Sequence, residues 1–267
     1  MFQEYKMAAN VLAFSTKRKG GVSQGNYAEF NINEFCGDDE AHVKENRRLL
    51  AEQLGIAPQA IVMPHQVHGI EVRQLGKEYF SLPENVRKMV VEGVDALITD
   101  LPSVCIGVST ADCIPVLLLD DVHHAVAAIH AGWRGTVQRI VQKTIAMMRA
   151  SFLTNPADIK AVIGPGISKD SFEVGDEVYE EFSEASFNMS SIAEQRPNMK
   201  RMGNVDQPLK WHIDLPLCNA QQLQQAGVKA ENIQQSGICT FKHSDEYFSA
   251  RRLGIKSGRI FTGIMLK

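Results

Sequence analysis

Cys113 and His130 are the residues whose types and positions most directly suggest chemistry. They stand at the outer ends of two apolar runs, residues 114–119 and 124–130, which a polar turn at 120–123 separates. An antiparallel hairpin with that turn places Cys113 opposite His130. Directly opposed residues have Cβ atoms about 4.5–5.5 Å apart on one face, so the thiol and the imidazole can reach one metal ion. A register slip of two makes them diagonal neighbours on the same face.

A loop at residues 63–69 carries two further imidazoles, His65 and His68, beside the amide of Gln66. One of these imidazoles would complete a His, Cys, His set that leaves a fourth position for water or substrate, as catalytic zinc sites do. A fourth protein ligand, for which His65 and Asp112 are the nearby candidates, would instead make the site purely structural.

The same residues permit a hypothesis without metal. Cys113 would be the nucleophile and His130 its base, with Asp112 or Gln66 orienting the imidazole, which together describe a cysteine hydrolase. Iodoacetamide labelling with and without chelator separates the two cases, because a bound metal masks a thiolate from alkylation.

Strands and helices must position these side chains, and their pattern predicts an α/β layered sandwich with mixed sheets. Several β-prone runs follow one another too closely for helical crossovers, so some strands must be antiparallel. The predicted strands cover residues 11–14, 70–75, 96–99, 104–109, 114–119, 124–130, 161–163 and 260–266. Helices are predicted over residues 40–54, 136–151 and 215–226, with Asp214 as an N-cap and Gly55 and Gly227 as stops.

The whole chain, residues 1–267, is predicted to form a single domain. Hydrophobic side chains make up 44% of the sequence, enough for a sizeable core, and we find no repeat or linker. The polar segment 183–208 is predicted to be a surface excursion.

The charge balance and the cysteine content indicate which classes of partner and which cellular compartment to expect. Lys and Arg number 28 against 31 Asp and Glu, and the net charge of -3 predicts neither a nucleic-acid nor a membrane partner. The 5 cysteines include no CxxC pair and the chain start carries no secretory signal, so a reducing, cytoplasmic location is expected.

The sequence resembles the laccase-domain family of bacterial YfiH- and YlmD-type proteins, also called multicopper polyphenol oxidases, over essentially its whole length. The matching motifs are STKRKGGVS at 15–23, ENRR at 45–48, HQVHG at 65–69, DALIT at 95–99, TADCIP at 110–115, HAGWRG at 130–135, IGPGI at 163–167 and FEVG at 172–175. The resemblance implies an α/β/β/α layered fold like that of cytotoxic-necrotising-factor cysteine hydrolases. It also implies a zinc site with His68, Cys113 and His130 as ligands.

The resemblance further implies a zinc-dependent purine nucleoside phosphorylase that acts on adenosine, inosine and S-methyl-5'-thioadenosine, with adenosine deamination as an additional activity. Its partners would be a purine nucleoside and phosphate. The H-x-E and P-C-x-x-C signature of cytidine-type deaminases is absent, so deamination would use a different scaffold. Copper-dependent oxidation of phenols is the alternative. The chain has 8 histidines and no H-x-H pair, too few imidazoles for a blue centre plus a trinuclear cluster.

Phosphate and substrate binding require cations and polar groups near the metal. Arg134 follows His130 at a predicted helix start and is expected to act in catalysis and to contact an anion. Gln66, Arg47 and Arg251 are the other candidates. Arg251 belongs to a tail that resembles the family's aromatic-Ser-x-Arg-Arg element, although Ala250 stands where the family has an aromatic ring.

Overall fold

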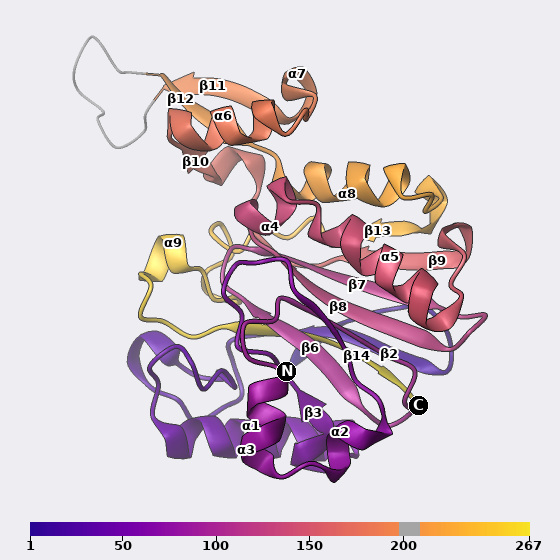
Figure 1. Ribbon diagram of the computed structural model, residues 1–267. Coiled ribbons are helices and arrows are strands. Elements are labelled where there is room, and N and C mark those ends of the chain that lie inside the picture. Colours follow the sequence, from indigo (N-terminus) through magenta and orange to yellow (C-terminus); the bar gives the residue numbers. More distant parts are fainter. Residues whose placement is uncertain (198–208) are drawn as a thin grey trace.

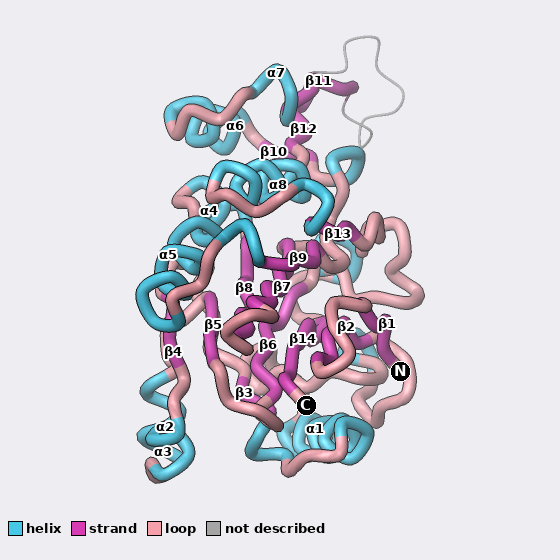
Figure 2. Tube along the Cα trace, turned by 90° about the vertical axis from the view of Figure 1, so that its right-hand side faces the viewer, coloured by secondary structure: helices cyan, strands magenta, loops and turns pink. Residues whose placement is uncertain are grey.

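Two large β-sheets face each other between outer layers of helices in this computed structural model, which describes residues 1–197 and 209–267 (Figure 1). Helix α1 (Glu40–Leu54) covers one sheet, and helices α5 (Ile140–Phe152) and α8 (Leu215–Gln225) cover the other (Figures 1 and 2). The predicted α/β/β/α layering with mixed sheets is therefore confirmed.

The first sheet has five strands in the order β1-β2-β14-β6-β3. It is antiparallel apart from the β3–β6 pair. Its strands are β1 (Phe2–Tyr5), β2 (Val11–Thr16), β3 (Ile61–Val62), β6 (Cys105–Thr110) and β14 (Ile260–Leu266).

The second sheet has six strands in the order β13-β9-β7-β8-β5-β4, with parallel pairs at its two edges and antiparallel pairs between them. Its strands are β4 (Val72–Gln74), β5 (Ala96–Thr99), β7 (Ile114–Asp120), β8 (Ala125–Ala131), β9 (Ile159–Ile163) and β13 (Ile233–Gln235).

Alternate residues of the central strands pack in different layers, as the pleat requires. Leu117 and Ala128 face the first sheet and join a cluster that includes Ile106. Their neighbours Leu118 and Ala127 point the other way, into the cluster that α5 and α8 complete. Strands β7 and β8 are therefore buried on both faces, which explains why both runs are almost entirely apolar.

Helix boundaries follow the predicted caps where local chemistry dominates. Helix α1 has the predicted bounds: Asp39 accepts from the backbone N–H groups at its start and Gly55 ends it with φ 68°. Asp214 caps α8 by accepting from Leu217 N at 2.9 Å, as predicted.

The predicted helix over residues 136–151 is in fact two helices. Helix α4 (Trp133–Val137) ends before Arg139, which adopts a left-handed conformation with φ 66°, and α5 then begins. The Arg139 guanidinium donates to Ala185 O at 2.7 Å and lies 3.6 Å from the Phe187 ring centroid. These tertiary contacts hold a break that the apolar stripe alone does not predict.

A third sheet was not predicted. It has the order β10-β12-β11 and consists of β10 (Glu173–Val174), β11 (Ala193–Pro197) and β12 (Leu209–Ile213). The segment 183–208, predicted to be a surface excursion, has regular structure through residue 197, where α6 (Asp176–Glu184) ends and α7 (Met189–Ile192) and β11 follow, and most of these residues are exposed or half-buried. Its remainder, 198–208, lies outside the described residues. The other short helices are α2 (Lys77–Ser81), α3 (Glu84–Val90) and α9 (Ala250–Leu253).

No helix in the described ranges has both the length and the apolar character needed to cross a membrane.

Candidate metal centre

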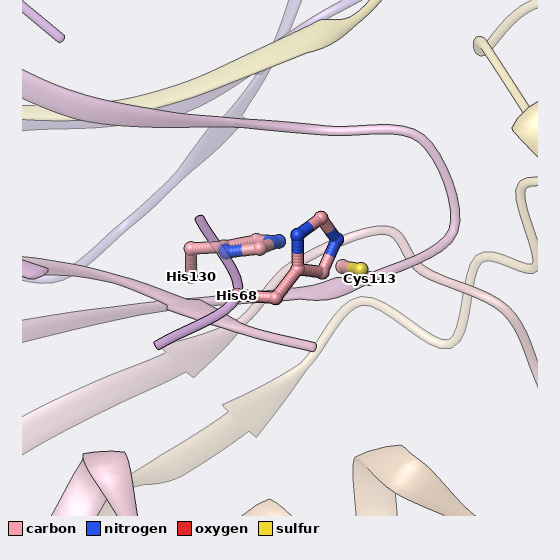
Figure 3. Close-up of side chains that lie close together, drawn as sticks. All are labelled: His68, Cys113 and His130. Carbon is pink, nitrogen blue, oxygen red and sulfur yellow. The ribbon is translucent and has the colours of Figure 1, made fainter. Parts of the chain in front are cut away.

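His68, Cys113 and His130 come together at one end of the β7–β8 hairpin, and their side chains point toward one another (Figure 3). One potential ligand atom from each lies within 4.8 Å of the others. The two imidazole rings are edge to face, with centroids 4.8 Å apart. Modest side-chain rotation therefore lets all three reach an ion at the usual bond lengths of about 2.0–2.3 Å.

The hairpin register differs from the prediction by two residues. The loop is 121–124 rather than 120–123, because Asp120 still pairs with Ala125, and His130 lies opposite Pro115 instead of Cys113. A slip of two keeps side chains on the same face. Cys113 and His130 therefore converge as diagonal neighbours, and the direct opposition predicted from the sequence is wrong.

Asp95 organises the two imidazoles, a role that its place in the sequence did not predict. Its Oδ1 lies 2.7 Å from His130 Nδ1, which leaves the other ring nitrogen to face the cluster. The same carboxylate accepts from the backbone N–H groups of Val67, His68 and Gly69 at 3.2, 3.0 and 2.8 Å. One fully buried carboxylate thus orients one ligand and fixes the loop that carries another.

Exposure falls steadily through the cluster. His68 is exposed, Cys113 is partly buried and His130 is 3% exposed. His68 also has φ 61°, so the loop turns sharply at this residue to present its side chain. The group is therefore open to solvent on the His68 side, while the Asp95–His130 pair forms its buried wall.

Gly132 leaves the space that an ion would need. A Cβ atom at this position would lie 3.1 Å from His68 Cδ2, 3.2 Å from Cys113 Sγ and 3.6 Å from His130 Cε1. Because Gly132 has no side chain, a space remains among the three candidate ligands, and we call this space the cradle. With a thiolate and two imidazoles as donors, the group fits zinc or copper.

A Gly132→Ala substitution is expected to weaken metal binding by about tenfold or more, because its methyl group displaces the side chains of His68 and Cys113. Titration with a competing chelator measures the change. Gly76→Ala is the matched control, since its Cβ meets only the carboxyl end of Glu78. Equal metal affinities for Gly132→Ala and the control would contradict the proposed cradle.

Ionisation of the cluster favours a thiolate. Burial opposes charge on Cys113, but the imidazoles of His130 and His68 outweigh it and lower the pKa of the thiol to about 6. Burial likewise opposes charge on His130, whereas Cys113 and Asp95 together raise its pKa to about 9. A thiolate is the form of cysteine that binds metal or attacks an electrophile.

Metal-free protein is expected to be alkylated by iodoacetamide fastest at Cys113. The rate should rise with pH through about 6, where the thiolate forms, and level off above it. Cys36 should react more slowly at neutral pH, since burial raises its pKa. Mass spectrometry of labelled peptides checks this, and bound metal should protect Cys113. Equal labelling of the two thiols in chelator would count against the expectation.

Neither the residues predicted to orient His130 nor those considered as a fourth metal ligand contact the cluster in these roles. Gln66 uses its amide on the backbone of Ser109, with bonds of 2.8 and 2.7 Å. His65 Nδ1 lies 2.7 Å from Glu92. Asp112 accepts from Thr240 and Arg251. Asp95 is therefore the orienter of His130, and neither His65 nor Asp112 belongs to the ligand group.

The predicted arginines lie in different surroundings. Arg134 is exposed on α4 with its guanidinium 4.3 Å from the Trp133 ring centroid. Arg251 is exposed and donates from Nη1 to Glu173 O at 3.1 Å. Arg47 instead donates to Ile61 O at 2.9 Å, on strand β3 beneath α1. Its contact thus ties α1 to the first sheet rather than to the ligand group.

The family model described as multi-copper polyphenol oxidoreductase laccase matches residues 12–267. The chain belongs to this family. The match includes all three candidate ligands and Asp95, so the cluster lies within the family domain.

Curated relatives within this family carry enzyme names. A purine nucleoside phosphorylase of Bacteroides thetaiotaomicron is 44% identical over 265 residues, covering 99% of this chain and 95% of that protein. Adenosine deaminase RL5, from an unknown prokaryotic organism, is 42% identical, covering 98% and 96%.

Solved structures of family members share the fold. YlmD from Geobacillus stearothermophilus superposes with a TM-score of 0.85 at 31% identity, covering 97% of this chain and 93% of its own. The layered architecture described above is therefore that of this laccase-domain family.

Proposed function

We propose that this protein is a zinc-dependent purine nucleoside phosphorylase acting on adenosine, inosine and S-methyl-5'-thioadenosine, with adenosine deamination as a second activity at the same site. The phosphorylase and deaminase names of relatives more than 40% identical over almost the whole chain support the substrate class. The observation that carries the proposal is the open His68–Cys113–His130 group, which is followed along the chain by the exposed Arg134 on helix α4. A cytoplasmic location remains a prediction.

His68, Cys113 and His130 would hold the zinc ion, which supplies Lewis-acid chemistry when bound. Asp95 keeps His130 in the tautomer whose free nitrogen faces the cluster. Burial of this wall excludes water from one side, and the exposed His68 side admits the nucleoside.

Phosphorolysis replaces the purine at ribose C1' with a phosphate oxygen, so the site must hold an anion beside the nucleoside. Arg134 lies on α4, four residues after His130, and its guanidinium is exposed without an ion-pair partner among the described residues. Five N–H donors in a planar fork suit phosphate. The adjacent Trp133 ring packs against the apolar cluster under α5 and its centroid lies 4.3 Å from the Arg134 guanidinium, so it supports this side chain.

Copper-dependent phenol oxidation is the second candidate, favoured by the name of the family model. Within the residues that the structure describes, one group of three or more metal-binding side chains is present. A single His, Cys, His group suits one-metal chemistry better than oxidation by several coppers.

A metal-free cysteine hydrolase would use the Cys113–His130 pair, with Asp95 orienting the imidazole.

Elemental analysis combined with inosine turnover tests the proposal. Zinc-loaded protein is expected to release hypoxanthine only when phosphate is present. Chelation should stop the release, and re-addition of zinc should restore it. Release that ignores phosphate would indicate hydrolysis, whereas no release from fully metallated protein would refute the phosphorylase assignment.

A further inference from the structure

Asp112 lies between β6 and β7, directly before the candidate ligand Cys113, and is not a ligand itself. Its φ of 94° is unusual for a residue other than glycine, and it is only 9% exposed. Such a backbone persists only where surrounding contacts fix it. Its carboxylate has no Lys, Arg or His side chain within 4.0 Å in the described part of the chain.

Both oxygens of this carboxylate instead bind the C-terminal segment. Thr240 Oγ1 donates to Oδ1 at 2.7 Å, and the backbone N–H of Arg251 donates to Oδ2 at 2.7 Å. The Asp112 carbonyl also accepts from Ile167 N at 2.7 Å. Three segments far apart in the sequence thus meet at the residue next to Cys113.

Arg251 is held at two points, by its backbone and by its side chain. Asp112 fixes its backbone N–H, and its Nη1 donates to the carbonyl of Glu173 at 3.1 Å. The side chain is nevertheless exposed. Since a guanidinium has five N–H donors, several remain free for an anion. The position of those donors relative to Cys113 therefore depends on the Asp112 carboxylate.

We propose that Asp112 is a positioning residue that holds Arg251, as a phosphate-binding group, in register with the loop that carries Cys113. This inference rests on the proposed phosphorylase function for the identity of the anion. Asp112 acts only through Arg251 and touches neither metal nor phosphate. Its hydrogen bond to a backbone N–H is charge-assisted, so a neutral amide replaces it poorly.

The test measures binding of inorganic phosphate to zinc-loaded protein by calorimetry, together with the KM for phosphate and the kcat with inosine. Asp112→Asn is expected to weaken phosphate binding and raise its KM by about tenfold with kcat changed less than about twofold, since misplacing a binding group costs affinity. Arg251→Ala should show at least the same loss. The double variant should be no worse than Arg251→Ala, because Asp112 acts through Arg251.

Two further variants sharpen the result. Thr240→Val removes the other hydrogen bond to the carboxylate without changing charge, so it keeps the inference testable if Asp112→Asn fails to fold. It should weaken phosphate binding by about threefold. Asp170→Asn removes an exposed charge that pairs with Lys242 and Arg196, does not touch Arg251, and should leave phosphate binding unchanged.

Unchanged phosphate affinity in Asp112→Asn, additive losses in the double variant, or no phosphate binding by the parent protein would each overturn the inference. Loss of zinc in proportion to lost phosphate binding would do so too, since it would assign Asp112 to the metal loop alone. If the predicted binding pattern appears without phosphorolysis of inosine, the positioning role stands and the proposed function fails.

Discussion

A Cys113→Ala variant is expected to lose metal and to release purine on the order of 10³-fold more slowly than the parent protein. The thiolate is the sole sulfur and the sole anionic ligand in the group, and the pKa of about 6 shows that its surroundings already favour this form. Two imidazoles alone bind zinc too weakly to keep the site filled. Metal content and phosphate-dependent turnover of inosine are the measurements.

Cys36→Ala is the matched control for this variant. Cys36 has the same intermediate exposure as Cys113, and its thiol contacts Asn31 and the Asn33 carbonyl rather than the ligand group. The control should keep both its metal and its activity. Retained turnover in Cys113→Ala would show that the cluster is not the reaction site, and retained metal would place the ion elsewhere.

An Asp95→Asn variant is expected to bind metal about 10–100-fold more weakly and to be destabilised by about 3 kcal/mol. The amide nitrogen of asparagine cannot accept from the loop N–H groups that the lost oxygen served, and it no longer fixes the tautomer of His130. Chelator competition and chemical denaturation measure the two effects.

The stabilisation by Asp95 also depends on pH. Burial opposes its charge, but His130 and the loop N–H groups hold the pKa of the carboxyl below its ordinary value. Its contribution to stability is therefore fully present above the unfolded pKa of about 4 and is lost as pH falls through the lower folded value. The stability difference between Asp95→Asn and the parent protein should shrink under acid conditions.

Asp120→Asn is the control that separates the loss of metal affinity from the loss of stability. Asp120 is also a buried carboxylate that contacts a histidine and backbone N–H groups, but it lies at the end of β7 far from Cys113. It is fully buried, its Oδ2 lies 2.9 Å from His123 Nδ1, and its Oδ1 accepts from the N–H groups of Val122 and His123. This control should lose stability but keep metal affinity. Equal metal affinities for the two variants would contradict the orienting role of Asp95.

Local chemistry made much of the fold predictable. Asp39 and Gly55 bound α1, and Asp214 begins α8, because a cap supplies partners to backbone groups that the helix leaves unpaired. The hairpin register was less accessible. Asp120 is polar, so the sequence pattern assigns it to the turn. Its carboxylate contacts His123, however, and strand β7 continues through Asp120, so the observed pairing differs from the predicted one by two residues.

Tertiary contacts determined what the sequence could not indicate. The contacts of Arg139 with Ala185 and Phe187 divide α4 from α5 within one apolar stripe. Strands β10, β11 and β12 mix charged and apolar residues. They show neither the alternation of a surface strand nor a continuous apolar run, so the sequence does not predict them.

The candidate site was predicted only in part. The types and spacing of Cys113 and His130 placed them on one face, and the family resemblance supplied His68. Asp95 was missed although a signal existed: it is the one charged residue in the otherwise apolar run 94–98. A carboxylate at the start of a buried strand needs hydrogen-bond donors, and a histidine that binds a metal usually donates its other ring N–H to such an acceptor.

Anomalous diffraction from crystals of the zinc-loaded protein, recorded on both sides of the metal absorption edge, tests the central claim most directly. We predict one ion bonded to Cys113 Sγ and to a ring nitrogen of each of His68 and His130, with a further position open to solvent. An ion that lacks the sulfur or either imidazole, or whose shell is closed by a fourth protein ligand, would contradict it.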